Sequence, residues 1–298
     1  MSGPHHSVHL RQHLSSCGGS IEINGSGGAH RAAERPRSAS KGHEDIIMDG
    51  QRTIIVTGSG RGIGRTVAQA FARQGDAVVV ADLVEERAQE TVDLIRAGGG
   101  AGEAVRVDVR TEASVAEMVA RAFAFGGRID VLVNGAGGYG QAFRATHETP
   151  EEEWDLVLES NLKGSFLCAK HVIPHMIAQG CGRIINFSSN AGRSTSPLLG
   201  ASYTAAKAGV FGLSRHLAIE YASKGILVNT IAPGPVNGDR VGDLLPSEGK
   251  RDSLATQIPL GRLAEFEDIS DVVLFMASDA SRFMTGAILD VNGGYVLA

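Results

Sequence analysis

A short strand that leads into a glycine-rich turn and then a helix constrains this chain more than any other stretch. Residues 52–57 are rich in isoleucine, valine and threonine, a pattern typical of a buried strand. The turn Gly58-Ser-Gly-Arg-Gly-Ile-Gly64 follows, and residues 65–73 form an amphipathic segment. Glycines let the backbone approach a pyrophosphate, and the helix N-terminus adds N–H groups and partial positive charge. The pattern therefore predicts a dinucleotide site at this turn, with a flexible glycine loop as the alternative.

Strands and helices continue to alternate after this turn. Further strand patterns lie at residues 77–81, 103–108, 129–133, 182–187, 226–232 and 286–291. Helical patterns lie between them, at about 85–97, 113–125, 150–176, 201–224 and 265–278. Alternating strands and helices form a parallel sheet that is covered on both faces. We therefore expect residues 48–298 to form a single α/β domain, a Rossmann-type doubly wound parallel sheet of about seven strands flanked by helices.

Two segments differ from this pattern. Residues 1–47 are rich in histidine, serine, glycine and arginine and show almost no apolar periodicity, so we expect a disordered N-terminal extension. Six of the ten histidines lie there, but their spacing is irregular, and we expect no metal site. Residues 238–260 carry charges, glycine and proline with patchy periodicity. We expect this second segment to be a substrate lid, because mobile lids commonly gate such sites.

Asp82 bears on the choice between NAD and NADP. It ends the second strand, 18 residues past Gly64, near the spacing expected for the acid that holds the adenosine ribose hydroxyls. A carboxylate at that place repels a 2′-phosphate and so favours NAD. Arg61 argues mildly for NADP, since an arginine in the glycine turn is able to reach a phosphate, but it is equally able to face water. We expect NAD, with NADP as the less favoured cofactor.

The third and fourth strands end in further candidate cofactor residues. Asp108 is placed to meet the adenine amino group, with Val109 packing on the ring. Helix capping by Asp108 or Thr111 is the alternative. The fourth strand closes with Asn134-Gly-Ala-Gly137, whose small residues leave room for a ligand at the carboxyl end of the strand.

The alanine-rich stretch from Ala201 to Ala208 predicts a helix that carries catalytic groups. Tyr203 and Lys207 are four residues apart, so they share one face of that helix. A lysine ammonium beside a tyrosine hydroxyl stabilises the phenolate, which makes the tyrosine a usable general acid and base. Taken alone, the pair is also typical of an ordinary helix surface.

These motifs together resemble the short-chain dehydrogenase/reductase family, from about residue 50 to the end of the chain. The resemblance rests on Thr57–Gly64, Asn134–Gly137, Ser189 and Tyr203-x-x-x-Lys207, in this order and spacing. Gly135 departs from the family's usual Asn-Asn-Ala-Gly, and we expect it to affect sheet contacts rather than chemistry.

The resemblance implies specific roles for the catalytic residues. Ser189 is expected to hydrogen-bond the substrate oxygen, with its neighbour Ser188 structural. Tyr203 exchanges a proton with the alcohol or carbonyl, and Lys207 binds the nicotinamide ribose. Asn161 is expected to hold a water that connects Lys207 to solvent.

The expected cofactor residues also include the loop after the sixth strand. The family often has threonine at the position of Gly238, which puts a carboxamide contact in doubt; Asn237 is a candidate substitute. The full cofactor set that we predict is Gly58, Arg61, Gly62, Ile63, Gly64, Asp82, Asp108, Val109, Asn134, Ala136, Tyr203, Lys207, Pro233 and Val236.

Composition excludes several other classes of protein. The net charge is −5 and no basic cluster stands out beyond residue 50, so no nucleic-acid partner is expected. An apolar run of about 18 residues is absent, so no membrane span is expected. The family resemblance implies a homotetramer that oxidises a small-molecule alcohol or reduces a ketone, and we expect a cytoplasmic protein. The alternatives are an NADP-dependent 3-oxoacyl (acyl-carrier-protein) reductase and a non-catalytic dinucleotide-binding regulator.

Overall fold

The structure is a computed structural model that describes residues 50–196 and 198–297, with the side chain of Arg240 left out. The predicted disordered extension over residues 1–47 lies outside these residues. The strands are β1 (Thr53–Thr57), β2 (Ala77–Asp82), β3 (Ala101–Arg106), β4 (Val131–Asn134), β5 (Gly182–Phe187), β6 (Ile226–Pro233) and β7 (Ile288–Val291). The α-helices are α1 (Gly62–Arg73), α2 (Glu85–Ala97), α3 (Glu112–Gly126), α4 (Glu151–Leu158), α5 (Gly164–Gln179), α6 (Asn190–Arg193), α7 (Gly200–Tyr221), α8 (Asp239–Leu244), α9 (Glu248–Ala255) and α10 (Phe266–Met276).

The seven strands form one parallel sheet in the order β3-β2-β1-β4-β5-β6-β7. The strand order reverses between β1 and β4, and open α/β sheets bind ligands at such a reversal, outside the carboxyl ends of the strands. Thr57, Asn134 and Asn186 lie side by side in the register, so β1, β4 and β5 end together. The predicted fold class is confirmed.

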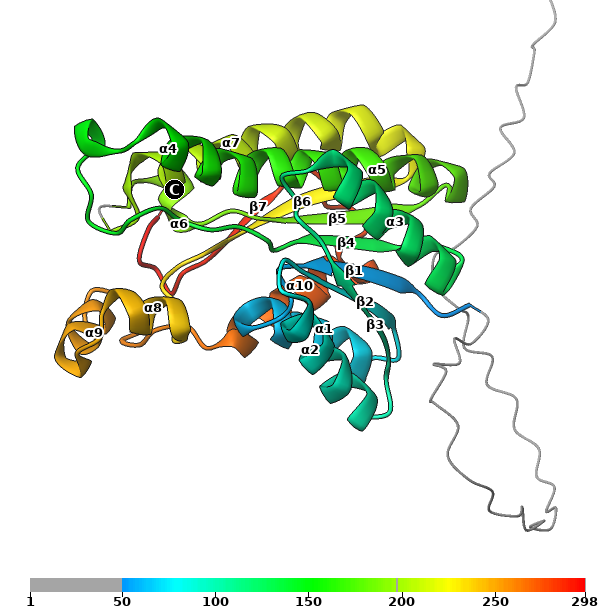
Figure 1. Ribbon diagram of the computed structural model, residues 1–298, viewed down its shortest axis with the longest axis horizontal. Coiled ribbons are helices and arrows are strands. Elements are labelled where there is room, and N and C mark those ends of the chain that lie inside the picture. Colours follow the sequence, from blue (N-terminus) through cyan, green and yellow to red (C-terminus); the bar gives the residue numbers. More distant parts are fainter. Residues whose placement is uncertain (1–49, 197, 298) are drawn as a thin grey trace, which may run out of the picture. The chain divides into compact units, whose positions relative to one another are not determined.

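Helices cover both faces of the sheet, as Figure 1 shows. Helices α3, α5 and α7 pack on one face, in a cluster that includes Met118, Leu132 and Met176. Helices α1, α2 and α10 pack on the other, around Phe71, Val80 and Ile269. The strands β1, β2 and β4 are buried on both faces, which explains why each is a nearly continuous apolar run rather than an alternating pattern.

The predicted single helix over residues 150–176 is wrong in one respect. Helix α4 gives way to a π-helical segment, η2 (Glu159–Lys163), before α5 begins. Such π-bulges are frequent at functional sites. Asn161 lies in this segment, and its side-chain amide donates to the carbonyl of Val157. The bulge therefore points Asn161 inward, where a regular helix of this pattern places an indifferent polar residue.

Residues 238–260 contain two short helices, α8 and α9, which lie beyond the carboxyl ends of the strands (Figure 1). Within the part of the chain that is described, no helix is both long and apolar enough for a membrane span.

Candidate active site

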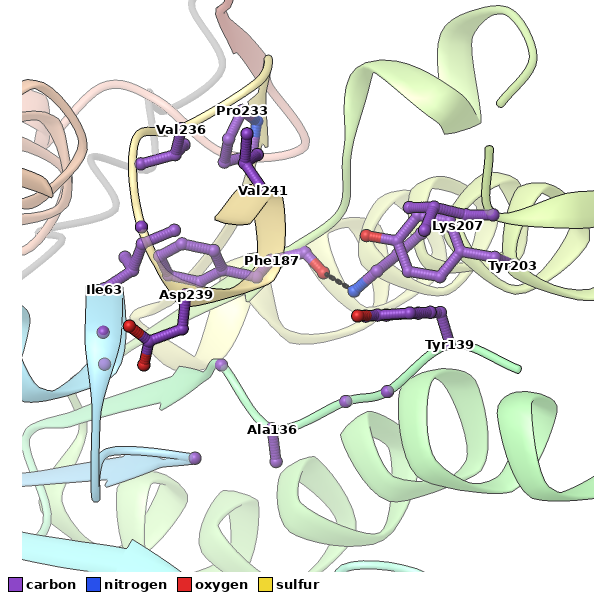
Figure 2. A pocket seen from close by; sticks show the side chains of 18 of the residues that line it. Ile63, Ala136, Tyr139, Phe187, Tyr203, Lys207, Pro233, Val236, Asp239 and Val241 are labelled. Atoms are coloured by element: carbon purple, nitrogen blue, oxygen red, sulfur yellow. Dashed lines mark hydrogen bonds between the residues drawn. The ribbon is translucent and has the colours of Figure 1, made fainter. Parts of the chain in front are cut away.

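A cavity of about 890 Å³ lies at the carboxyl ends of the strands, where the strand order reverses between β1 and β4. The loops after β1, β4, β5 and β6 contribute to its wall, together with α8 and α9. Figure 2 shows Tyr203, Lys207 and Tyr139 grouped on one side of it, with Ile63 and Asp239 on another. The cavity has the size of a site that holds a cofactor together with a small substrate.

The glycine turn forms a backbone cradle at the start of α1. Gly58 has φ +67°, and a Cβ on it would lie 2.8 Å from the Cα of Ala136. A Cβ on Gly64 would lie 2.2 Å from the carbonyl oxygen of Gly58. The loops after β1 and β4 therefore touch through backbone atoms, and larger residues would push them apart.

The N-terminus of α1 is open to an anion. Its N-cap residue, Arg61, makes no capping side-chain bond, and the first turn has no acidic residue. Helices α2, α3 and α10 each carry an acid in the first turn. The unsatisfied N–H groups and the positive end of the helix dipole fit a pyrophosphate. This cradle, lined by Gly62, Ile63 and Gly64, fits the predicted dinucleotide.

Asp82 lies beside this cradle, at the end of β2. One oxygen of its carboxylate accepts the N–H of Gly60 at 2.9 Å, and the other accepts the N–H of Val84 at 3.1 Å. Each oxygen keeps acceptor capacity for a second donor. Leu83, half exposed, lines the cavity next to it. The carboxylate is thus held in place by backbone groups and faces the ligand space.

Two arginines lie near this carboxylate. Arg61 is 58% exposed and reaches Asp239 of α8 at 4.0 Å, a weak contact. Arg87 lines the cavity, and its Cβ lies against the backbone of Gly60. No sequence motif marks Arg87, because an arginine in the first half of a helix is ordinarily a solvated residue.

Asp108 and Val109 both line the cavity. The carboxylate of Asp108 accepts the guanidinium of Arg110 at 2.6 Å, and this hydrogen bond lowers the pKa of Asp108. The capping alternative is wrong for Thr111, which is the N-cap of α3 but makes no capping side-chain bond. Val109 is buried, and a Cβ on Gly164 would collide with it.

Asn134 lies behind the cavity wall rather than on it. Its amide donates to Asn186 at 2.8 Å, and the Asn186 amide donates to Ser214 of α7 at 2.8 Å. This buried chain ties β4, β5 and α7 together. The neighbouring Ala136 does line the cavity. The side chain of Asn134 supports the wall, and its predicted contact with the cofactor stays a prediction.

The loop after β6 presents Pro233 and Val236 to the cavity. Val236 pairs with Ala264 in an isolated parallel bridge, in which the flanking residues Pro235 and Asn237 make the hydrogen bonds. The bridge leaves the N–H and C=O of Val236 on the opposite side of the strand, so neither group is used by the bridge.

Phe266 explains the glycine at position 238. A Cβ on Gly238 would lie 2.6 Å from the ring of Phe266, so a threonine does not fit while the ring stays in place. The ring also lies 3.9 Å from a Cβ position on Gly62 and lines the cavity. Asn237 donates its amide to the carboxylate of Glu265 at 3.2 Å, so its proposed substitute role requires that bond to be exchanged.

Tyr203 and Lys207 lie on one face of α7 and are 4% and 6% exposed. The Lys207 ammonium is 5.6 Å from the centre of the Tyr203 ring and donates to the carbonyl of Phe187 at 2.9 Å. Both line the cavity. The Ser188 hydroxyl donates to the Lys207 carbonyl at 2.7 Å, which agrees with its predicted structural role. The structure thus holds the predicted pair in a largely dehydrated site.

Ser189 does not line the cavity. It is the N-cap of α6: its hydroxyl accepts the N–H of Ala191 at 3.1 Å and donates to the side chain of Asn190 at 3.0 Å. Asn190 and Ser188 line the cavity in its place. Serine is a favoured N-cap, so local capping competes with the predicted contact to substrate. That contact stays a prediction that needs the hydroxyl to turn.

Asn161 is 1% exposed, and its amide also donates to the carbonyl of Gly138 at 2.8 Å. Its side-chain oxygen has no hydrogen-bond partner among the described residues. A buried acceptor in this state suits an ordered water. The predicted role of Asn161 in holding a water stays a prediction, and the geometry leaves one acceptor for it.

Tyr139 lines the cavity, although the sequence motifs do not predict a role for it. It packs against the small cluster formed by Val157, Ala191 and Tyr203. Figure 2 shows its ring on the same side as Lys207. Its position two residues after Gly137 was the available signal. Arg193 does not line the cavity and pairs with Asp290.

The protein-family model described as "Enoyl-(Acyl carrier protein) reductase" matches residues 58–296. The chain is 42% identical over 245 residues to a cis-4-hydroxycyclohexanecarboxylate dehydrogenase from Sinomonas cyclohexanicum, covering 82% of this chain and 96% of that one. It is 39% identical over 244 residues to a 3-oxoacyl-[acyl-carrier-protein] reductase from Staphylococcus epidermidis, covering 82% of this chain and 98% of that one.

A solved structure shares the fold. The crystal structure of a short-chain alcohol dehydrogenase from Sinorhizobium meliloti 1021 superposes with a TM-score of 0.78 and 34% sequence identity. The match covers 82% of this chain and 96% of that one.

Proposed function

The chain belongs to the short-chain dehydrogenase/reductase family, and we propose that it is an NAD-dependent oxidoreductase of secondary alcohols or ketones with Tyr203 as general acid and base. Family membership makes it an oxidoreductase that acts on a CH–OH group. The cofactor preference, the substrate and the residue roles are the proposed part.

The observation that carries the proposal is the placement of Tyr203 and Lys207 opposite the glycine cradle in one cavity. Gly62, Ile63 and Gly64 would hold the pyrophosphate of a dinucleotide, and Tyr203 and Lys207 line the same cavity. The bound nicotinamide supplies or accepts the hydride. The chain's own residues therefore need to position the substrate and move one proton.

Tyr203 transfers that proton at its phenolic oxygen. It takes the proton from a substrate alcohol, or returns it to a carbonyl oxygen. The Lys207 ammonium stabilises the phenolate by charge, and its hydrogen bond to Phe187 fixes its position. Ser189 holds the substrate oxygen once its hydroxyl leaves the α6 cap. Burial of the pair excludes bulk water from this transfer.

Asp82 supports NAD. Its carboxylate is fixed by two backbone N–H groups and has acceptor capacity for the ribose hydroxyls. A 2′-phosphate at that place would meet a like charge, and Leu83 beside it offers no donor. The preference therefore follows from an unfavourable contact with NADP as much as from a favourable one with NAD.

An NADP-dependent 3-oxoacyl reductase is the second candidate. The observation that favours it is Arg87, which lines the cavity beside Asp82, together with the exposed Arg61. Arginine is the residue best suited to hold a phosphate. The 39% identity to reductases of this kind points the same way.

The test is a titration of the purified protein with NADH and, in parallel, with NADPH. Cofactor fluorescence measures the binding of each nucleotide. Tighter NADH binding, and NAD reduction with secondary alcohols such as cyclohexanol, supports the first candidate. Tighter NADPH binding with reduction of 3-oxoacyl thioesters supports the second. Binding of neither nucleotide would contradict both.

The quaternary structure and the lid are also proposals. An apolar hollow lined by Leu158, Leu162, Phe166 and Leu213 lies on the outer side of α4, α5 and α7. Apolar hollows of this kind suit a second protein surface, and a homotetramer is our proposal. Light scattering coupled to size exclusion tests it.

Helices α8 and α9 line the cavity and form the proposed lid.

A further inference from the structure

The substrate side of the cavity is walled mainly by apolar side chains. Leu156 and Val157 of α4 and Leu198 and Leu199 before α7 form one wall. The segment 238–260 forms the other, with its apolar residues Val241, Leu244, Leu245 and Leu254. Leu245 and Leu254 are nearly fully buried. This space suits a compact apolar body such as a ring.

One face of α9 is turned toward this space. Lys250, Ser253 and Leu254 line the cavity, and their spacing of three and four residues is that of a single helical face. Lys250 lies at the exposed rim, in the first turn of the helix. The next residue, Arg251, is turned away and donates to the backbone carbonyls of Leu245 and Pro246. Lys250 therefore faces the ligand while Arg251 supports the helix.

Lys250 forms no ion pair with any described residue of the cavity lining. The carboxylates in its lining are Asp82, Asp108 and Asp239. Asp82 and Asp108 follow β2 and β3, on the cofactor side, and Asp239 faces Arg61. A lysine at an apolar rim keeps its ammonium in water until an anion joins it, and pairing then offsets the loss of hydration.

We propose that Lys250 binds the carboxylate of the substrate, which carries its alcohol or ketone on a compact apolar body between α9 and Tyr203. This inference rests on the proposed function and narrows its substrate class to hydroxy or oxo carboxylates. A phosphate of an acyl thioester is a second source of negative charge. The single described cation on this face fits a monoanion better, because phosphates are usually held by several donors.

The experiment compares compounds that carry a carboxylate with compounds that lack one. Binding of cyclohexanecarboxylate and of cyclohexanol to the NADH complex is measured by calorimetry, in the wild type and in Lys250→Met. Turnover of 4-hydroxycyclohexanecarboxylate, cyclohexanol and 3-hydroxybutyryl-CoA is measured in parallel. Lys250→Arg retains the charge, and Lys224→Met, outside the cavity lining, is the matched control.

Wild type is expected to prefer each carboxylate by about 10- to 100-fold, the range of a charge-assisted hydrogen bond. Lys250→Met is expected to lose this preference through KM, with cyclohexanol unaffected. Lys250→Arg should keep most of it, and Lys224→Met should match wild type. Circular dichroism checks that the variants fold.

Three outcomes overturn the inference. If wild type and Lys250→Met had the same affinity for cyclohexanecarboxylate, Lys250 would have no role in binding it. Equal wild-type affinity for the carboxylate and cyclohexanol would remove the anion subsite. If Lys250→Met lost turnover of 3-hydroxybutyryl-CoA alone, Lys250 would bind the phosphates of the thioester and not a substrate carboxylate. Failure of the proposed function looks different: carboxylate binding would depend on Lys250 while no alcohol or ketone was turned over.

Discussion

The ammonium group of Lys207 donates a 2.9 Å hydrogen bond to the carbonyl oxygen of Phe187, the last residue of β5. The bond joins helix α7 to the carboxyl end of the sheet (Figure 2). A long, flexible lysine is thereby held in one place beside Tyr203. Backbone anchoring of this kind lets a buried cation stabilise a phenolate without losing its own orientation.

Replacing Tyr203 with phenylalanine should abolish most turnover while leaving cofactor binding intact. Phenylalanine fills the same buried volume but has no proton to transfer, so kcat is expected to fall by about 10²- to 10⁴-fold. Stopped-flow turnover and NADH fluorescence measure the two effects. Tyr221→Phe, at the far end of α7 and outside the cavity lining, is the control. Wild-type turnover in Tyr203→Phe would rule out the proton-transfer role.

Replacing Asp82 with asparagine should weaken the preference for NAD. The amide oxygen can still accept one of the loop N–H groups, but the charge and one charge-assisted bond to ribose are lost. NADH affinity is expected to fall about 10-fold, and NADPH affinity to rise. Fluorescence titration with both nucleotides gives the ratio. Asp93→Asn, on the exposed side of α2, is the control, and an unchanged ratio in Asp82→Asn would favour the arginines as the determinants.

Replacing Gly64 with alanine should disrupt the cradle. The added Cβ would lie 2.2 Å from the Gly58 carbonyl, so the turn has to shift. Overpacking of this kind destabilises by about 1–3 kcal/mol, and the displaced N–H groups should no longer bind NADH. Gly212→Ala is the matched control, because Gly212 lies on the exposed side of α7 and a Cβ there would meet nothing within 4 Å. That variant should gain up to about 1 kcal/mol and keep its cofactor affinity, as urea unfolding and titration would show.

Acid should remove a stabilising contact at the start of α10. The Arg262 guanidinium and the N–H of Glu265 lower the pKa of Asp268 to about 2, from the ordinary aspartate value of 3.8. Since the folded-state pKa is depressed, the contribution is complete above about pH 4 and is lost as pH falls toward 2. Asp268 is partly exposed, so the contribution is about 1 kcal/mol at most.

Urea unfolding of wild type and Asp268→Asn between pH 3 and 7 tests this pH dependence. The difference in unfolding free energy should be constant near neutrality and shrink toward pH 3. Asp271→Asn, on the same helix, is the control. A difference that grew as the pH fell would contradict the sign.

Local patterns were sufficient for the fold and for part of the site. The β-branched runs and the helical segments between them predicted the parallel sheet, and helix α2 begins and ends where the sequence placed it. The glycine turn and the Tyr203–Lys207 pair could also be predicted, since each depends on residues within one turn or helix. The predicted helix over 150–176 missed η2, because a π-bulge has no marker in hydrophobic periodicity.

The partners of individual polar and aromatic side chains could not be predicted. Ser189 caps α6 and lies off the cavity, and Asn134 bonds to Asn186 behind its wall. The sequence contains both residues in the expected motifs, but their orientation depends on which neighbour competes for each polar group. Phe266 fills the space beside Gly238, a pairing that only the packing of α10 against the loop after β6 creates.

The sequence by itself determined the order of strands and helices, the cradle at α1 and the shared face of Tyr203 and Lys207, because helix and strand periods act over a few residues. Tertiary structure alone decided that Lys250, Tyr139 and Phe266 line the same cavity as that pair. Side chains from separate elements meet only after the buried faces of the helices have packed on the sheet, and that packing depends on the whole core at once.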